Sequence, residues 1–224
     1  MTSLPATVIF DLDGTLVDTA PDLTAALNHA LLSLGRPGVL PESVRHMVGH
    51  GARRLLERGL AATGDVSPDL IERGFAPFLA YYAEHIADGS RPYPGVEAAL
   101  DRLAAAGCGL AICTNKPVAL SEKLVAALGW SGRFAANLGF DSVVRAKPDP
   151  SHLLATIDAA GGCPAASVFV GDSITDTTTA KAANVPVIAV SFGFSDRPAA
   201  ELGADAVIDH YDDLVPAMER LWRR

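Results

Sequence analysis

The chain has 224 residues, of which 18 are basic and 26 are acidic, so its formal net charge is −8 at pH 7. With 49% hydrophobic and 20% charged residues, the composition fits a compact folded chain and excludes an intrinsically disordered one. The acidic balance argues against a nucleic-acid partner, because phosphate backbones are met by clustered lysines and arginines.

The chain also lacks the marks of an exported or membrane protein. We find no basic leader followed by a long apolar stretch, and no window of the roughly 18 apolar residues that a membrane span needs. Three cysteines are an odd number and have no zinc-site spacing, so they do not indicate a disulfide framework or a zinc site. We therefore expect a cytoplasmic protein with no membrane partner.

The first apolar segment, residues 6–10, predicts a buried strand. Residues 16–93 then show helical patterns and no convincing strand, with helices expected at 22–34, 42–48, 52–62 and 69–86. Turn-forming residues separate these helices and close the region at residues 88–95. The economical interpretation is a helical domain inserted after the first strand.

From residue 94 onward, short apolar strands alternate with helices. We expect strands at 110–113, 142–144, 168–170, 187–190 and 206–208, and helices at 96–106, 118–128, 152–160 and 177–183. Because such alternation produces a parallel sheet covered by helices on both faces, we predict an α/β fold with a Rossmann-like core. The core would comprise residues 1–15 and 94–224, and the inserted α-helical domain residues 16–93.

Two strand ends carry paired aspartates. The first strand runs directly into Asp11 and Asp13, and Gly14 permits a tight turn after them. In an open parallel sheet, ligands bind beyond the carboxyl ends of the strands. Two carboxylates there suit Mg²⁺, or a division of work between a nucleophile and a proton carrier. Asp172 and Asp176 follow another strand, although a carboxylate at 176 is also explained as a helix cap.

Two further strand ends carry a hydroxyl, an amide and lysines. Thr114, Asn115 and Lys116 precede a proline at an expected helix start, where free backbone N–H groups suit a phosphate. Lys147 precedes Pro148 and would either project into the strand-end cleft, where it would neutralise an anion, or remain a solvated surface charge.

Together, these four segments resemble the haloacid dehalogenase superfamily of phosphotransferases, and the order of the motifs matches along the whole chain. The resemblance identifies residues 16–93 with the helical cap of that superfamily. Within it, the segments at 92–96 and 114–117, and the cap segment at 48–52, resemble the phosphoglycolate phosphatase branch.

The resemblance implies a role for each matched residue. Asp11 would be the nucleophile that forms an aspartyl-phosphate, and Asp13 the acid and then the base. Thr114 and the backbone of Asn115 would hold phosphate oxygens, and Lys147 would neutralise the phosphate and the nucleophile. Mg²⁺ would bind Asp11, the backbone carbonyl of Asp13 and Asp172, with Asp176 supporting the metal from outside its ligand set.

The resemblance predicts a Mg²⁺-dependent phosphomonoester hydrolase whose partner is a small phosphorylated metabolite, with 2-phosphoglycolate as the best single substrate. His50, Arg53 and Lys116 would meet the substrate carboxylate, although His50 and Arg53 also fit a helix start with solvated side chains. The cap would close over the site, with hinges near residues 16–19 and 90–94. The oligomeric state stays unknown.

Alternatives remain within the same superfamily. A phosphatase or a mutase acting on another sugar phosphate, pyrophosphate or a nucleotide would carry the same motifs. A dinucleotide-binding protein would instead show G-x-G-x-x-G after its first strand. A non-catalytic protein would be expected to lack at least one of Asp11, Asp13, Lys147 or Asp172, and all four are present.

Overall fold

The structure, a computed structural model, describes residues 4–45, 47–48 and 51–222. Its centre is a six-stranded parallel sheet with the strand order β5-β4-β1-β6-β7-β8. β1 lies in the middle of this sheet, with β4 and β5 on one side of it and β6, β7 and β8 on the other. The strands are β1 (Thr7–Phe10), β4 (Gly109–Cys113), β5 (Ala136–Leu138), β6 (Ser167–Gly171), β7 (Val187–Val190) and β8 (Ala206–Ile208).

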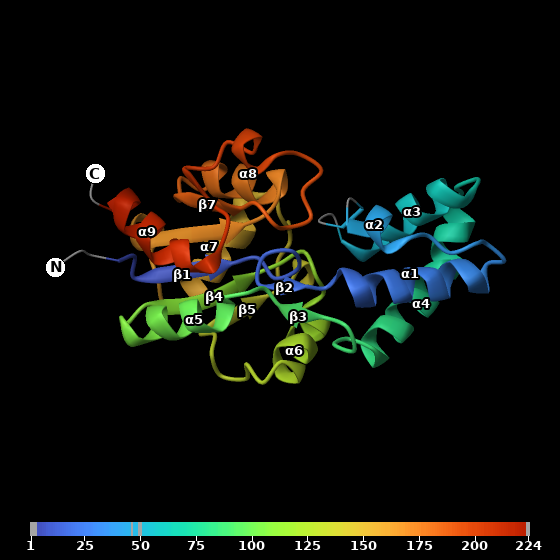
Figure 1. Ribbon diagram of the computed structural model, residues 1–224, viewed down its shortest axis with the longest axis horizontal. Helices are drawn as coiled ribbons and strands as arrows, with labels where there is room; N and C mark the ends of the chain where they lie inside the picture. The colour runs from blue at the N-terminus through green and yellow to red at the C-terminus, as the bar shows by residue number, and fades with distance from the viewer. Residues whose placement is uncertain (1–3, 46, 49–50, 223–224) are drawn as a thin grey trace.

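Helices cover both faces of the sheet, as the continuous apolar strands predicted (Figure 1). Side chains alternate between the faces of β1, so Val8 and Phe10 pack into one core cluster and Ile9 into another. One face carries α5 (Val96–Ala105), α6 (Val118–Ala127) and α9 (Leu214–Trp222), and the other α7 (Pro150–Ala159) and α8 (Ile174–Ala182).

In the described part of the chain, four helices follow β1 in sequence before the next strand of the sheet, and we call residues 20–84 the helical insert. In Figure 1 the insert projects from the core on the side opposite the two chain termini. Within it, α1 packs against α4, and α3 packs against both. The helices are α1 (Ala20–Ser33), α2 (Pro41–Arg45), α3 (Ala52–Thr63) and α4 (Pro68–Glu84).

A short antiparallel ribbon joins the insert to the core, although no strand was expected in this region. It is formed by β2 (Val17–Asp18) and β3 (Arg91–Pro92), which together hold only two residue pairs. Such short strands leave no periodic pattern in the sequence, because the contact between distant segments creates them. The ribbon brings the entry and the exit of the insert side by side.

The prediction of a strand at residues 142–144 was wrong. The edge strand is β5, Ala136–Leu138, and residues Phe140–Ser142 form a 3₁₀ turn instead. β5 has little apolar character because Asn137 occupies its centre, whereas the apolar Val144 is fully exposed. Helix α9 was not predicted, and its buried side chains Leu214, Ala217 and Met218 complete the core beside β8.

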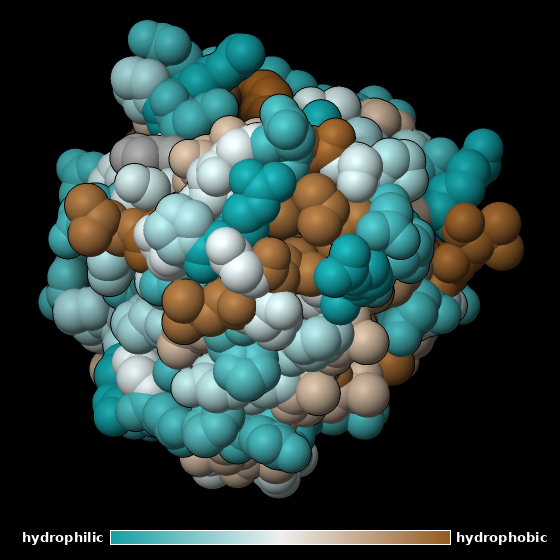
Figure 2. All heavy atoms as spheres, turned by 90° about the vertical axis from the view of Figure 1, so that its right-hand side faces the viewer, coloured by the Kyte–Doolittle hydropathy of each residue, from teal (hydrophilic) through white to brown (hydrophobic). Residues whose placement is uncertain are grey.

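The surface at the outer end of the insert is largely hydrophilic, with separate hydrophobic side chains among the polar ones (Figure 2). Leu32, Leu40 and Val66 are large apolar side chains of this region that are exposed. In the described part of the chain, no helix combines the length and the apolar character needed to cross a bilayer.

Candidate active site

The carboxyl ends of three neighbouring strands form the floor of the site. β1 lies between β4 and β6 and is hydrogen-bonded to both. The residues that follow these strands are Asp11 after β1, Thr114 after β4 and Asp172 after β6. Parallel strands end at the same edge of the sheet, so three segments far apart in sequence meet at the point where the chain direction across the sheet reverses.

Lys147 lies at the centre of a buried charge network. Its ammonium Nζ is 3.1 Å from Oδ2 of Asp11 and 2.7 Å from Oδ1 of Asp176. The side chain of Lys147 is only 1% exposed, so these carboxylates rather than water compensate its charge. Of the two environments open for Lys147, the strand-end cleft is therefore the one observed.

Asp172 and Asp176 are held by different sets of donors. Oδ1 of Asp172 accepts a hydrogen bond from the hydroxyl of Thr15 at 3.0 Å, and Oδ2 accepts one from the backbone N–H of Phe194 at 2.7 Å. Oδ2 of Asp176 accepts from the backbone N–H groups of Asp172 and Ser173 and from the hydroxyl of Ser173. Asp176 thus also caps α8 in a reciprocal capping box.

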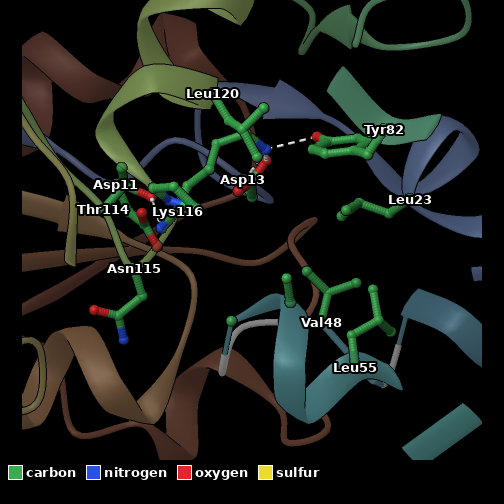
Figure 3. A pocket seen from close by; sticks show the side chains of 13 residues that line it. Asp11, Asp13, Leu23, Val48, Leu55, Tyr82, Thr114, Asn115, Lys116 and Leu120 are labelled. Atoms are coloured by element: carbon green, nitrogen blue, oxygen red, sulfur yellow. Dashed lines mark hydrogen bonds and ion pairs between the residues drawn. The ribbon is translucent and has the colours of Figure 1, made fainter. Parts of the chain in front are cut away.

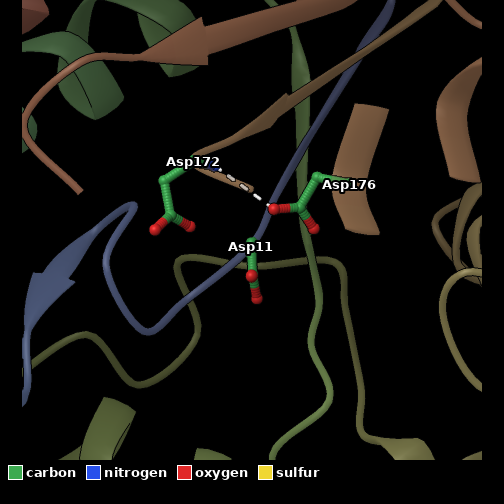
Figure 4. A group of neighbouring side chains, drawn as sticks. All are labelled: Asp11, Asp172 and Asp176. Carbon is green, nitrogen blue, oxygen red and sulfur yellow. Dashed lines mark hydrogen bonds between the residues drawn. The ribbon is translucent and has the colours of Figure 1, made fainter. Parts of the chain in front are cut away.

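The site carries more negative than positive charge. Asp11, Asp172 and Asp176 are buried, and one carboxylate oxygen from each lies within 4.8 Å of the others (Figure 4). Burial raises the pKa of Asp11 to about 7 although Lys147 lowers it, and burial also raises the pKa of Asp172 well above its usual value. Burial would lower the pKa of Lys147, but Asp11 and Asp176 outweigh it and raise that pKa.

This donor set fits a hard divalent cation. Three buried carboxylates lie close together, the ammonium of Lys147 contacts only Asp11 and Asp176 among them, and Mg²⁺ prefers carboxylate oxygens. Both oxygens of Asp176 already accept hydrogen bonds, Oδ1 from Lys147 and Oδ2 from three donors. Asp11 and Asp172 have more free lone pairs, so they suit direct ligation and Asp176 suits support of the cluster.

His152 fixes the loop that carries Lys147. Its Nδ1 accepts a hydrogen bond from the backbone N–H of Lys147 at 3.3 Å, and its Nε2 lies 3.2 Å from the carbonyl oxygen of Leu138. Burial, followed by the charge of Lys147, lowers the pKa of His152 to about 4. The imidazole is therefore neutral near pH 7 and ties the loop to the end of β5.

A cavity of about 50 Å³ opens beside this cluster, between the core and the insert (Figure 3). Asp13 lies in its wall, and both of its carboxylate oxygens accept hydrogen bonds from Nζ of Lys116, at 2.9 and 3.1 Å. The same ammonium donates to the phenol oxygen of Tyr82, which comes from α4, at 2.6 Å. Burial, together with Asp13 and Asp22, raises the pKa of Tyr82 well above its usual value.

Thr114 and Asn115 line the cavity from the core side. The hydroxyl of Thr114 accepts a hydrogen bond from the backbone N–H of Lys116 at 3.2 Å. The amide nitrogen of Asn115 donates to the backbone carbonyl of Lys147 at 3.0 Å, which joins two of the motif segments directly. The buried Oδ1 of Asn115 has no hydrogen-bond partner among the described residues.

His50 and Arg53 were the two residues of the insert predicted to meet the substrate carboxylate, and the structure describes only Arg53. Arg53 forms an exposed ion pair with Glu72 and lies over the ring of Phe75, outside the described lining of the cavity. His50 lies outside the described residues. Sequence reasoning missed Tyr82, since nothing in the run of aromatic residues on α4 distinguishes it from the neighbouring Tyr81.

Comparisons with known proteins agree on one family. The model of the haloacid dehalogenase-like hydrolases matches residues 5–184. The phosphoglycolate phosphatase of Mesorhizobium japonicum is 49% identical over 96% of both chains, and that of Caulobacter vibrioides is 46% identical over 95% of this chain and 90% of its own. The crystal structure of a predicted phosphoglycolate phosphatase from Haemophilus somnus superposes with a TM-score of 0.90 at 30% identity, covering 96% of this chain and 98% of that one.

Proposed function

Because this chain belongs to the haloacid dehalogenase-like hydrolases, we propose that it is a Mg²⁺-dependent phosphatase that hydrolyses 2-phosphoglycolate. The observation that carries the reaction type is the buried cluster of Asp11, Asp172 and Asp176, in which the ammonium of Lys147 contacts Asp11 and Asp176. The substrate is supported by relatives named phosphoglycolate phosphatase that match nearly the whole chain. The small cavity with Lys116 in its wall also suits a short anionic substrate.

We assign the core to residues 1–15 and 94–224 and the cap to residues 16–93. This division is supported by the sheet, which uses β1 and then only strands after residue 94, and by the ribbon at which the chain leaves the core and returns. Movement of the insert about this ribbon would open the cavity for exchange of substrate and product.

In the first chemical step, a carboxylate oxygen of Asp11 attacks phosphorus while the bond from phosphorus to the leaving oxygen breaks. Asp13 gives a proton to that oxygen, so glycolate leaves as an alcohol and Asp11 carries the phosphoryl group. In the second step, Asp13 takes a proton from water as the water attacks phosphorus. Phosphate is released and the carboxylate of Asp11 is restored.

The remaining residues bind and neutralise the phosphoryl group. Lys147 offsets the repulsion between the phosphate and Asp11. Thr114 and the backbone of Asn115 hold phosphate oxygens, as phosphoryl transfer requires mainly positioning and charge stabilisation. Asp11, Asp172 and the backbone carbonyl of Asp13 would hold Mg²⁺. When bound, Mg²⁺ would supply positive charge to the phosphate oxygens and the attacking carboxylate.

The test is phosphate release from 2-phosphoglycolate by the purified protein with Mg²⁺ and after metal removal by EDTA. Asp11→Asn, which keeps the shape of the side chain but removes the nucleophile, should lower kcat at least about a thousandfold. Asp158→Asn, the same change at an exposed aspartate outside the site, should leave the rate unchanged. Full activity of Asp11→Asn, or full activity without metal, would contradict the mechanism.

A further inference from the structure

The wall that the insert contributes to the cavity is almost entirely apolar. Its described lining residues are Leu23, Val48, Gly51, Ala52, Leu55 and Tyr82. Among these residues, Tyr82 alone carries a polar group on its side chain. The insert therefore has one described side chain with which to recognise a polar part of a substrate by hydrogen bonding.

Tyr82 is fixed where it meets the charged groups of the core. Its side chain is buried at 1% exposure, and its phenol oxygen accepts a hydrogen bond from Nζ of Lys116 (Figure 3). The ammonium of Lys116 has three N–H donors, and its hydrogen bonds run to the two oxygens of Asp13 and to Tyr82. The phenol also has a proton to donate, and no hydrogen bond from it to another described residue is present.

We propose that Tyr82 is the specificity-determining residue of the insert and forms, with Lys116, the subsite for the carboxylate of the substrate. This inference rests on the proposed function and adds a residue that recognises the leaving group of the substrate. A carboxylate beside Lys116 would accept the O–H of Tyr82 and one N–H that the ammonium now gives to an oxygen of Asp13. A charged acceptor thus meets one cation and one neutral donor, both already in position.

The same arrangement disfavours larger polar substrates. A sugar phosphate brings several hydroxyl groups, and the other described side chains from the insert offer them no donor or acceptor. Leu120 and Pro117 extend the apolar lining on the core side. Burying unpaired hydroxyl groups costs affinity, so the pocket favours a short acid over a polyol.

Two phosphomonoesters separate recognition of the carboxylate from the chemical step. Ethyl phosphate has the same chain length as 2-phosphoglycolate and carries a methyl group in place of the carboxylate. The kcat and KM for both esters are measured for the wild type, Tyr82→Phe and Tyr81→Phe. Tyr81 is the matched control, because it lies on the same helix and its ring packs against His29 and His85, outside the cavity lining.

For Tyr82→Phe we expect the preference for 2-phosphoglycolate over ethyl phosphate, in kcat/KM, to fall at least about tenfold through a higher KM, since one hydrogen bond to a charged group is lost. Tyr81→Phe should retain the wild-type preference. An unchanged preference in Tyr82→Phe, or an equal loss for both esters, overturns the inference, because a structural role would affect both esters alike. A thermal melt of each variant verifies folding.

Failure of the proposed function gives a different pattern. A wild-type enzyme that hydrolyses ethyl phosphate but not 2-phosphoglycolate refutes the substrate and the carboxylate subsite while leaving a phosphatase. A wild-type enzyme that hydrolyses neither ester refutes the proposed function itself and the subsite with it. Selective loss in Tyr82→Phe is the only result that supports the inference.

Discussion

Replacement of Lys147 by methionine tests whether the buried cluster depends on its ammonium. Methionine fills most of the same volume but has no charge, so Asp11 and Asp176 lose the cation that lies 3.1 and 2.7 Å from their oxygens. Removing one partner of a buried ion pair costs about 3–5 kcal/mol, because the remaining charge stays out of water without compensation. We expect Lys147→Met to lower the free energy of unfolding by an amount in this range.

A second substitution shows where that cost arises. Asp176→Asn removes one of the two carboxylates that Lys147 contacts, while the amide oxygen can still accept from the three donors that bind Oδ2. Alone it should cost about 1.5–3 kcal/mol, the value of a hydrogen bond to a charged group. In the double variant, position 176 carries a neutral amide, so no uncompensated carboxylate is left there. The combined cost should therefore be smaller than the sum of the single costs by about 1–3 kcal/mol.

The assay is urea unfolding of the four proteins at pH 8 with EDTA, so that bound metal does not contribute and Asp11, with a pKa of about 7, is mostly ionised. A matched cycle on the exposed pair of Asp69 and Arg73 on α4, whose charged atoms lie 3.3 Å apart, should show a coupling of at most about 0.5 kcal/mol. Additive costs for Lys147→Met and Asp176→Asn would refute the reasoning, because they would mean that solvent compensates these charges.

Three further measurements address other parts of the site. Gly14→Ala places a Cβ 2.5 Å from Oδ2 of Asp172 at a φ of +84°, so it should weaken Mg²⁺ binding measured by calorimetry. The control is Gly107→Ala, which has a similar φ of +82° but open space around the new Cβ. It should lower the free energy of unfolding by only about 1–2 kcal/mol through backbone strain. Protons compete with Mg²⁺ for Asp11, whose pKa is about 7 without metal, so apparent Mg²⁺ affinity should fall up to about tenfold per pH unit below 7; an affinity independent of pH would contradict this. His152 has a pKa of about 4 in the folded chain and an ordinary value of 6.5, so the unfolded chain binds more protons between these values. Stability should therefore fall as the pH is lowered from 6.5 to 4, and urea unfolding of His152→Gln should show a smaller fall.

Sequence reasoning recovered the parts of the fold that burial alone determines. β1 and β7 are buried strands covered on both faces, and they lie where the apolar runs in the sequence predict them. The prediction missed β5 because an edge strand is covered less completely by the rest of the protein, so Asn137 is tolerated in its centre. The β2–β3 ribbon exists only through a contact between residues more than 70 positions apart, which no local pattern records.

Some residues of the candidate site could be predicted from the sequence and others could not. Asp11 and Asp172 could be singled out because each directly follows an apolar strand, and Lys147 because it is a lysine that precedes two prolines in an expected loop. Tyr82 could not, since the feature that distinguishes it is the 2.6 Å contact with Lys116, which lies in the loop after β4, 34 residues away. Helical periodicity predicts that a tyrosine faces inward, but it does not predict what that tyrosine meets there.

The β2–β3 ribbon also makes the insert a module that can be exchanged. Because Asp18 pairs with Arg91, the two points at which the chain crosses between core and insert are neighbours in space. A short turn between these residues could replace the intervening segment without lengthening any path within the core, and closing so short a loop costs little chain entropy. The same core sheet could therefore carry inserts of different sequence, in natural relatives or in engineered variants, without a change in the core.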